Sequence, residues 1–220
     1  MLPENKSLNI REILQKIRII PVAVFNDVDK AMKTAELLLK NSINILEITL
    51  RTEAAFECIS KVKADFPEMM IGAGSVLSKE SFEQAFDSGA VFCVAPSLDI
   101  DLIIYSSKKK ISFIPGVITP TELNAALSAG SKIIKIFPAA GFYNTGYIKS
   151  ITAPFKMKDF SLVPTGGINE NNIIEYLKTD KVIACGASYI SDPKLIDKGD
   201  FEELDRRIKK IKSLVSAIQV

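Results

Sequence analysis

One lysine, Lys135, lies within an apolar stretch that reads as a buried β-strand, Ile133-Ile134-Lys135-Ile136-Phe137-Pro138. Alternate strand residues face opposite sides, and apolar residues on both sides are typical of a strand covered on both faces. An ammonium group buried there must pair with an acid, lose its proton or take part in chemistry. We interpret Lys135 as the nucleophile of an imine-forming enzyme. The structural alternatives are a side chain that extends out of the strand end, or a simple ion pair.

A second strand-like segment, Leu46-Glu47-Ile48-Thr49-Leu50-Arg51-Thr52, alternates apolar and polar residues, which places Glu47, Thr49 and Arg51 on one face. In a catalytic interpretation, Glu47 is a general base whose pKa is raised by burial, and Arg51 binds a substrate carboxylate through two hydrogen bonds. A purely structural ion pair between Glu47 and Arg51 is an equally good explanation of these residues taken alone.

Glycine-rich turns follow several of the expected strands. Ser75, after Gly72-Ala73-Gly74, is a possible donor to an anion, and Pro96 either shapes a pocket wall or ends its strand. Two later turns suit a phosphate group, because backbone N–H groups at glycines and helix N-termini bind anions. The phosphate-binding candidates in these turns are Thr165, Gly166, Gly167, Gly186 and Ser188.

Strands and helices are expected to alternate along the chain. A helix at residues 5–18 precedes a strand at 19–24 and a helix from Asp27 to about Lys40. Further strands are expected at 44–49, 69–73, 90–94, 111–115, 132–137, 160–164 and 181–185, and further helices at 52–65, 79–88, 99–107, 120–129, 145–151, 170–177 and 200–218. Eight such repeats predict an α/β fold, a (β/α)₈ TIM barrel with an extra N-terminal helix, and a doubly wound sheet is the alternative. No linker interrupts residues 1–220, so we expect a single domain.

Composition narrows the possible functions. The 220 residues carry a formal net charge of +2, which gives no electrostatic case for nucleic acid, and no apolar run approaches membrane-spanning length. The chain has no histidine, which excludes Ser-His-Asp and Cys-His catalysis and histidine–zinc sites. Its three cysteines, Cys58, Cys93 and Cys185, lack metal-ligand spacing, and we expect reduced thiols in a cytoplasmic protein.

Five segments together resemble the 2-keto-3-deoxy-6-phosphogluconate (KDPG/KHG) aldolase family: LEITLRT (46–52), GAGSVL (72–77), IPGVITPTE (114–122), KIFPA (135–139) and VPTGGI (163–168). The resemblance extends from about residue 19 to residue 190. It implies a homotrimeric class I aldolase of the Entner–Doudoroff pathway that cleaves KDPG to pyruvate and glyceraldehyde 3-phosphate. It further implies Lys135 as the imine lysine, Glu47 as the acid–base group, Arg51 and Ser75 as carboxylate ligands, Phe137 beside the imine, and neither a metal nor a cofactor.

The chain departs from the family pattern at three places. Ser75 replaces the usual threonine, Ala95-Pro96-Ser97 replaces Ser-Pro-Gly, and Cys185-Gly186-Ala187-Ser188-Tyr189 stands where Gly-Gly-Ser-Trp is typical. The retained Leu-Arg-Thr favours a phosphogluconate over a phosphogalactonate substrate, and 4-hydroxy-2-oxoglutarate is a further possible substrate. The late glycine turns alone would also suit a thiamine-phosphate-synthase-like barrel or a non-catalytic phosphate-binding barrel.

Overall fold

The computed structural model describes residues 9–141 and 144–218, in which parallel strands alternate with helices. The strands are β1 (Ile19–Ala23), β2 (Ile45–Thr49), β3 (Met70–Gly74), β4 (Phe92–Val94), β5 (Ser112–Ile114), β6 (Gly116–Val117), β7 (Ile133–Ile136), β8 (Ser161–Pro164) and β9 (Cys185–Ala187). The α-helices are α1 (Ile10–Ile17), α2 (Val28–Lys40), α3 (Ala55–Asp65), α4 (Lys79–Asp87), α5 (Ile100–Lys109), α6 (Pro120–Ser128), α7 (Thr145–Thr152), α8 (Ile173–Leu177), α9 (Pro193–Lys198) and α10 (Phe201–Ser216). Two 3₁₀ turns are η1 (Ala153–Phe155) and η2 (Ser188–Ser191).

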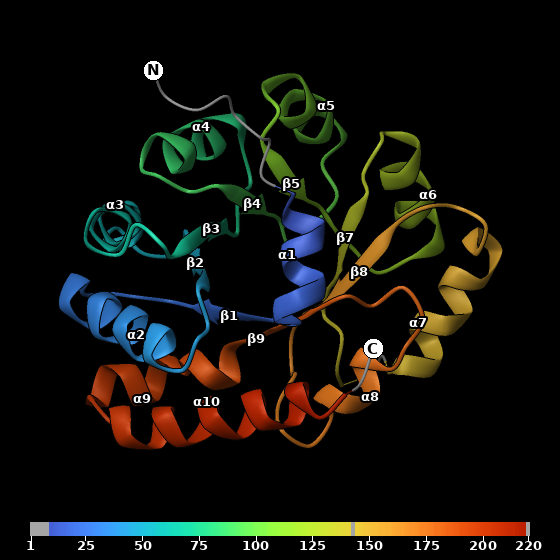
Figure 1. The fold of residues 1–220 in the computed structure, drawn as a ribbon. Coiled ribbons are helices and arrows are strands. Elements are labelled where there is room, and N and C mark those ends of the chain that lie inside the picture. The colour runs from blue at the N-terminus through green and yellow to red at the C-terminus, as the bar shows by residue number, and fades with distance from the viewer. Residues whose placement is uncertain (1–8, 142–143, 219–220) are drawn as a thin grey trace.

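The strands close into a barrel. They form two parallel sheets, in the orders β5-β4-β3-β2-β1-β9 and β6-β7-β8. β6 continues β5 beyond Pro115, which has no N–H to donate to the ladder. At the other edge, bridges from Leu162 to Val182 and from Thr165 to Gly186 join β8 to the β9 segment. The nine strands of the described ranges thus occupy eight positions, and the helices after α1 lie outside them (Figure 1), which confirms the predicted (β/α)₈ fold.

The helix before β1 is the predicted N-terminal addition. α1 buries Ile10 and Leu14, and residues 5–8 of the expected helix lie outside the described residues. Nε of Arg11 donates to Oγ of Ser161, the first residue of β8, at 2.8 Å, and the guanidinium pairs with Asp159 at 2.8 Å. α1 therefore crosses the amino ends of the strands (Figure 1). The carboxyl ends, where barrel enzymes carry their active sites, lie on the opposite side.

The structure corrects four details of the sequence prediction. The strand expected at 111–115 is split at Pro115 into β5 and β6. The last strand starts at Cys185 rather than near 181, because Lys181 has a positive φ of 64° and a turn occupies the residues before it. α8 begins at Ile173 rather than 170, after an Asn169–Asn172 turn in which Asn172 Oδ1 accepts from Asn169 N at 2.9 Å. The fourth detail is α9, a helix that the sequence patterns did not predict.

The core fills the barrel and the layer beneath the helices. Four phenylalanines, Phe25, Phe82, Phe92 and Phe160, are among its largest fully buried side chains. Such burial stabilises a domain by about 25 cal/mol per Å² of apolar surface removed from water. Across the described parts of the chain, every helix falls short of the length or the apolar character needed to cross a bilayer.

Candidate active site

A pocket of about 220 Å³ opens at the carboxyl ends of the barrel strands. Side chains from β1, β2 and β7 line it, together with the turns that follow β8 and β9. The lining residues are Val22, Val24, Glu47, Thr49, Arg51, Lys135, Phe137, Thr165, Gly166, Ser188 and Pro193. The predicted lysine and carboxylate therefore meet in one cavity at the end of the barrel where chemistry is expected.

Lys135 and Glu47 form the most deeply buried charged contact of this pocket. Nζ of Lys135 lies 3.9 Å from Oε1 of Glu47, and the two side chains are 6% and 3% exposed. That distance is within reach of an ion pair but too long for a hydrogen bond. Within the described residues Oε1 accepts no hydrogen bond. A buried acceptor without a partner is costly, so this oxygen is poised to receive a proton or a hydroxyl from a bound molecule.

The surroundings of Glu47 change the pKa of its carboxyl group and fix its position. Burial raises the pKa of this carboxyl, and the nearby charges of Lys135 and Arg51 only partly oppose the shift. Its position depends on Gly74 of the neighbouring strand: a Cβ at Gly74 would lie 2.2 Å from Oε1 of Glu47. Only glycine leaves room there for the carboxylate, which explains one of the two glycines in the GAGS turn. A raised pKa brings a glutamate closer to the range useful for general base catalysis.

Arg51 and Ser75 are joined at the rim of the pocket. Nε of Arg51 donates to Oγ of Ser75 at 3.0 Å, while the rest of the exposed guanidinium remains available. Ser75 has a φ of 59°, the left-handed region that non-glycine residues rarely adopt. Strain of this kind persists where surrounding structure holds it, often at ligand sites. The bond orients the guanidinium so that its two terminal nitrogens can bind one carboxylate.

Two turns form the other side of the pocket. Thr165 and Gly166 follow β8, and Gly166 and Gly167 have φ values of 97° and 76° that favour glycine. Gly186 of β9 pairs with Thr165, and a Cβ on it would lie 2.4 Å from Oγ1 of Thr165, so the turn after β8 is in direct contact with β9. Ser188 starts η2 and is exposed toward the pocket opening. Glycine-rich turns at this end of a barrel are typical of phosphate sites.

The structure places some of the predicted site residues in the pocket wall and others outside it. Seven of them line the pocket: Glu47, Arg51, Lys135, Phe137, Thr165, Gly166 and Ser188. Ser75 and Gly186 adjoin it through Arg51 and Thr165. Gly167 packs against Ala140, and Pro96 packs against Gly116 of β6, so neither lines the pocket. Interpreting Pro96 as the end of its strand therefore suits its position better than interpreting it as a pocket wall.

Four lining residues were not predicted from the sequence: Val22, Val24, Thr49 and Pro193. Thr49 donates its hydroxyl to the carbonyl oxygen of Ala23 at 3.0 Å, which binds β2 to β1 inside the barrel. Pro193 belongs to α9, the unexpected helix, and Asp192 caps that helix by accepting from Lys194 N. An acidic N-cap followed by proline is a helix-start signal that could have revealed it.

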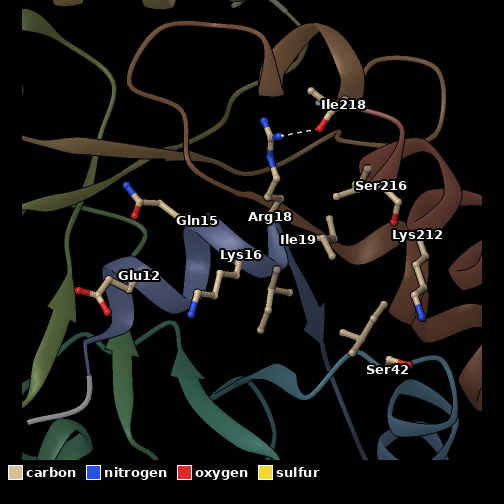
Figure 2. Close-up of a pocket in the computed structure, with 12 residues that line it drawn as sticks. Glu12, Gln15, Lys16, Arg18, Ile19, Ser42, Lys212, Ser216 and Ile218 are labelled. Atoms are coloured by element: carbon tan, nitrogen blue, oxygen red, sulfur yellow. Dashed lines mark hydrogen bonds between the residues drawn. The ribbon is translucent and has the colours of Figure 1, made fainter. Parts of the chain in front are cut away.

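A larger cavity, of about 690 Å³, lies at the opposite end of the barrel (Figure 2). It is bounded by α1, the start of β1, the turn before β2 and the end of α10. Lys16 and Lys212 lie along it, and the Arg18 guanidinium donates hydrogen bonds to the carbonyl oxygens of Ile218 and Leu177. None of the candidate site residues lines this cavity, so its size does not make it the reaction centre.

The fold and the small pocket define a (β/α)₈-barrel enzyme with a buried lysine–carboxylate pair at the mouth of the barrel. The sequence model of the family described as KDPG and KHG aldolase matches residues 10–207. The chain belongs to this family of aldolases, which makes it a lyase.

Individual relatives agree with this assignment. The 2-dehydro-3-deoxy-phosphogluconate aldolase of Treponema pallidum is 34% identical over 197 residues, which cover 90% of this chain and 93% of the relative. The KDPG aldolase of Legionella pneumophila, solved with pyruvate captured at low pH as a covalent carbinolamine intermediate, superposes with a TM-score of 0.85 at 32% identity, covering 90% of this chain and 96% of that one. The Zymomonas mobilis enzyme, solved with 3-phosphoglycerate, gives a TM-score of 0.83 at 28% identity, covering 93% and 95%.

Proposed function

We propose that this protein reversibly cleaves KDPG to pyruvate and glyceraldehyde 3-phosphate through an imine formed by Lys135. The observation that carries the proposal is the buried contact between Lys135 and Glu47, which places an amine and a carboxylate 3.9 Å apart in a pocket at the mouth of the barrel. The covalent pyruvate carbinolamine in the Legionella relative is the adduct that a nucleophilic amine forms with a keto acid, and it supports the same chemistry here.

The first stage is attack on the keto group. The unprotonated amine of Lys135 adds to C2 of the substrate to give a carbinolamine, and loss of water yields a protonated imine. The ring of Phe137, whose centroid lies 5.0 Å from Nζ, covers this position and limits access of water. A positively charged imine next to the reacting bond acts as an electron sink.

The second stage is cleavage of the C3–C4 bond. Glu47 accepts the proton of the C4 hydroxyl, a role that suits an ionised carboxylate with an oxygen that no other group occupies. The C3–C4 bonding electrons move into the imine, so that an enamine forms and glyceraldehyde 3-phosphate leaves as the aldehyde. Glu47 then gives the proton that it accepted from the C4 hydroxyl to C3 of the enamine. Hydrolysis of the resulting imine releases pyruvate and restores the amine of Lys135 and the ionised carboxylate of Glu47.

Both ends of the substrate need a binding group. Arg51, oriented by Ser75, binds the carboxylate next to the keto carbon. Thr165, Gly166 and Ser188, which line the pocket, bind the distal phosphate, and Gly167 and Gly186 support them as direct neighbours of Gly166 and Thr165. The Zymomonas relative was solved with 3-phosphoglycerate, which carries a carboxylate and a phosphate, the two charged groups that KDPG also carries.

The remaining expectations complete the proposal. One catalytic domain spans residues 1–220, and 4-hydroxy-2-oxoglutarate, which lacks the phosphate, is cleaved to pyruvate and glyoxylate at lower efficiency. A cytoplasmic location is supported by the three cysteines, Cys58, Cys93 and Cys185, which are all free and buried. Burial raises the pKa of Cys58 to about 11 and that of Cys93 to about 12, so these thiols stay protonated. A homotrimer is supported by the partly exposed apolar residues Leu77, Phe86, Ile100 and Ile104.

Borohydride trapping tests the proposed chemistry directly. The protein is incubated with pyruvate and then with borohydride, and peptide mass analysis locates the reduced adduct. The proposal predicts a single secondary amine at Lys135. An unmodified Lys135 in a protein that still releases pyruvate from KDPG would overturn the imine mechanism. Light scattering at several protein concentrations tests the trimer separately.

A further inference from the structure

We propose that Arg207 of α10 is a positioning residue for the phosphate half of the active site, acting through Tyr189. The inference rests on the proposed function and extends it to a helix outside the barrel mouth. Neither residue lines the pocket. Their effect is to hold the segment from Ser188 to Pro193 at a set distance from the glycine turn after β8.

The Arg207 side chain links three parts of the chain. Its Nε donates to Oε1 of Glu203 at 2.9 Å, one turn earlier on α10. Its Nη1 donates to Oδ2 of Asp192 at 3.0 Å and to the carbonyl oxygen of Tyr189 at 3.4 Å. The side chain is only 19% exposed, so these bonds are partly shielded from water. A planar guanidinium can make all of them at once, which an ammonium group cannot do in the same geometry.

Asp192 divides its carboxylate between two tasks. Oδ1 accepts from Lys194 N at 2.9 Å and caps α9, while Oδ2 receives the bond from Arg207. Pro193 follows directly and lines the reaction pocket, as does Ser188 at the other end of the segment. The Asp192 carboxylate therefore connects Arg207 of α10 to the first turn of α9 and to Pro193 in the pocket wall.

Tyr189 joins the Arg207 guanidinium to the segment that follows β9. The Cζ atom of Arg207 lies 4.5 Å from the centroid of the Tyr189 ring, a cation–π contact. The pKa of the Tyr189 hydroxyl is raised, first by burial and next by the carboxylate of Glu170. Glu170 comes three residues after Gly167, in the turn that leads to α8. Because Tyr189 belongs to η2, directly after β9, its contact with Arg207 joins α10 to the segment that carries Ser188.

Ionised carboxylates surround Arg207 and favour its hydrogen bonds. Hydrogen bonds from Arg206 and Arg207 lower the pKa of Glu203 to about 2, so that carboxylate is ionised at any pH where the protein acts. Arg206 donates to the same carboxylate at 2.6 Å and 2.9 Å. Among the described residues of α10, Arg207 alone donates a side-chain hydrogen bond to Asp192.

A simple structural role would also explain these contacts, so the test must separate positioning from folding. We compare Arg207→Met with Arg207→Lys, which keeps the charge but loses the planar fork. Lys209→Met is the matched control, because Lys209 also pairs one turn back on α10, with Asp205, and does not contact the Ser188–Pro193 segment. Four quantities are measured for each variant: the melting temperature, the steady-state constants for KDPG, the inhibition constant of inorganic phosphate, and the rate of borohydride-trapped pyruvate adduct formation.

Positioning of the phosphate turns affects only the substrate that carries phosphate. We expect Arg207→Met to raise KM for KDPG and the inhibition constant of inorganic phosphate by about tenfold, with kcat nearly unchanged. Arg207→Lys should recover only part of the loss, and Lys209→Met should behave as wild type. Pyruvate has no phosphate, so adduct formation on Lys135 should proceed at the wild-type rate in every variant.

Two outcomes overturn the inference. One is an unchanged KM for KDPG in Arg207→Met. The other is a parallel loss of KDPG cleavage and pyruvate adduct, which indicates a general effect on folding. Failure of the wild-type protein to form the adduct has a different meaning, because it contradicts the proposed function itself.

Discussion

The Nζ of Lys135 and Oε1 of Glu47 lie 3.9 Å apart, inside a barrel where both side chains are more than nine-tenths buried. Neither charge can be hydrated well there, yet the two groups do not complete a hydrogen bond with each other. Isolated ion pairs of this kind contribute little to stability, since desolvation offsets their attraction. The arrangement is better explained by what a substrate brings: a carbonyl for the amine and a hydroxyl for the carboxylate.

Replacing Lys135 by alanine should abolish cleavage of KDPG. The imine cannot form without the amine, and we expect kcat to fall by at least about a thousandfold, as for other covalent nucleophiles. Pyruvate release measures the activity, and circular dichroism checks the fold. Lys132→Ala is the control, because Lys132 is 65% exposed and pairs only with Asp159 among the described residues. Activity near the wild-type level in Lys135→Ala would exclude Lys135 as the nucleophile.

Glu47→Gln should remove one limb of the pH–rate profile. Burial raises the pKa of Glu47 above its usual 4.5, and the carboxylate is the active form. Wild-type kcat should therefore decline as the pH falls through the raised pKa of Glu47. The decline should begin at a higher pH than an ordinary glutamate, with a pKa of 4.5, would give. In Glu47→Gln, kcat should fall about 10²–10⁴-fold and this acid limb should disappear. Trapping of pyruvate on Lys135 should persist, and a profile identical to the wild type would assign the base to another group.

Much of this arrangement could be predicted from sequence, because strand alternation puts Glu47 and Arg51 on one face and apolar neighbours on both sides of Lys135 indicate a buried strand. The barrel itself followed from repeated strand and helix patterns. Other features depend on long-range geometry. The six-residue α9 is too short to show a helical pattern, so Pro193 was missed. The contact between Arg51 and Ser75 requires a left-handed backbone at Ser75, and a serine in the sequence does not reveal that conformation.

Gly74→Ala should impair catalysis without removing any catalytic group. A Cβ at this position would lie 2.2 Å from Oε1 of Glu47, so the carboxylate must move. A displacement of about 1 Å at a reacting group can cost about a hundredfold in rate, and we expect a loss of that order in kcat. The control is Gly146→Ala in α7, where the nearest atom to a Cβ is a side-chain oxygen of Asn144 at 3.1 Å. Equal activity of the two variants would show that Glu47 has room to adjust.

Ser75 offers a pair of variants that separate binding from backbone strain. Ser75→Ala and Ser75→Gly both remove the hydroxyl that accepts from Nε of Arg51, so both should raise KM for KDPG by about three- to tenfold, with a smaller effect on kcat. They differ in the backbone: at φ 59° alanine keeps the strain of a left-handed residue, whereas glycine has none.

Chemical denaturation should therefore find Ser75→Gly more stable than Ser75→Ala by about 1 kcal/mol, although the two have the same KM. The comparison needs no further control, because each variant is the reference for the other. A KM that rises in only one of them would mean that Ser75 acts through the shape of the turn. Unchanged KM values in both would mean that Arg51 binds the carboxylate without help from the serine hydroxyl.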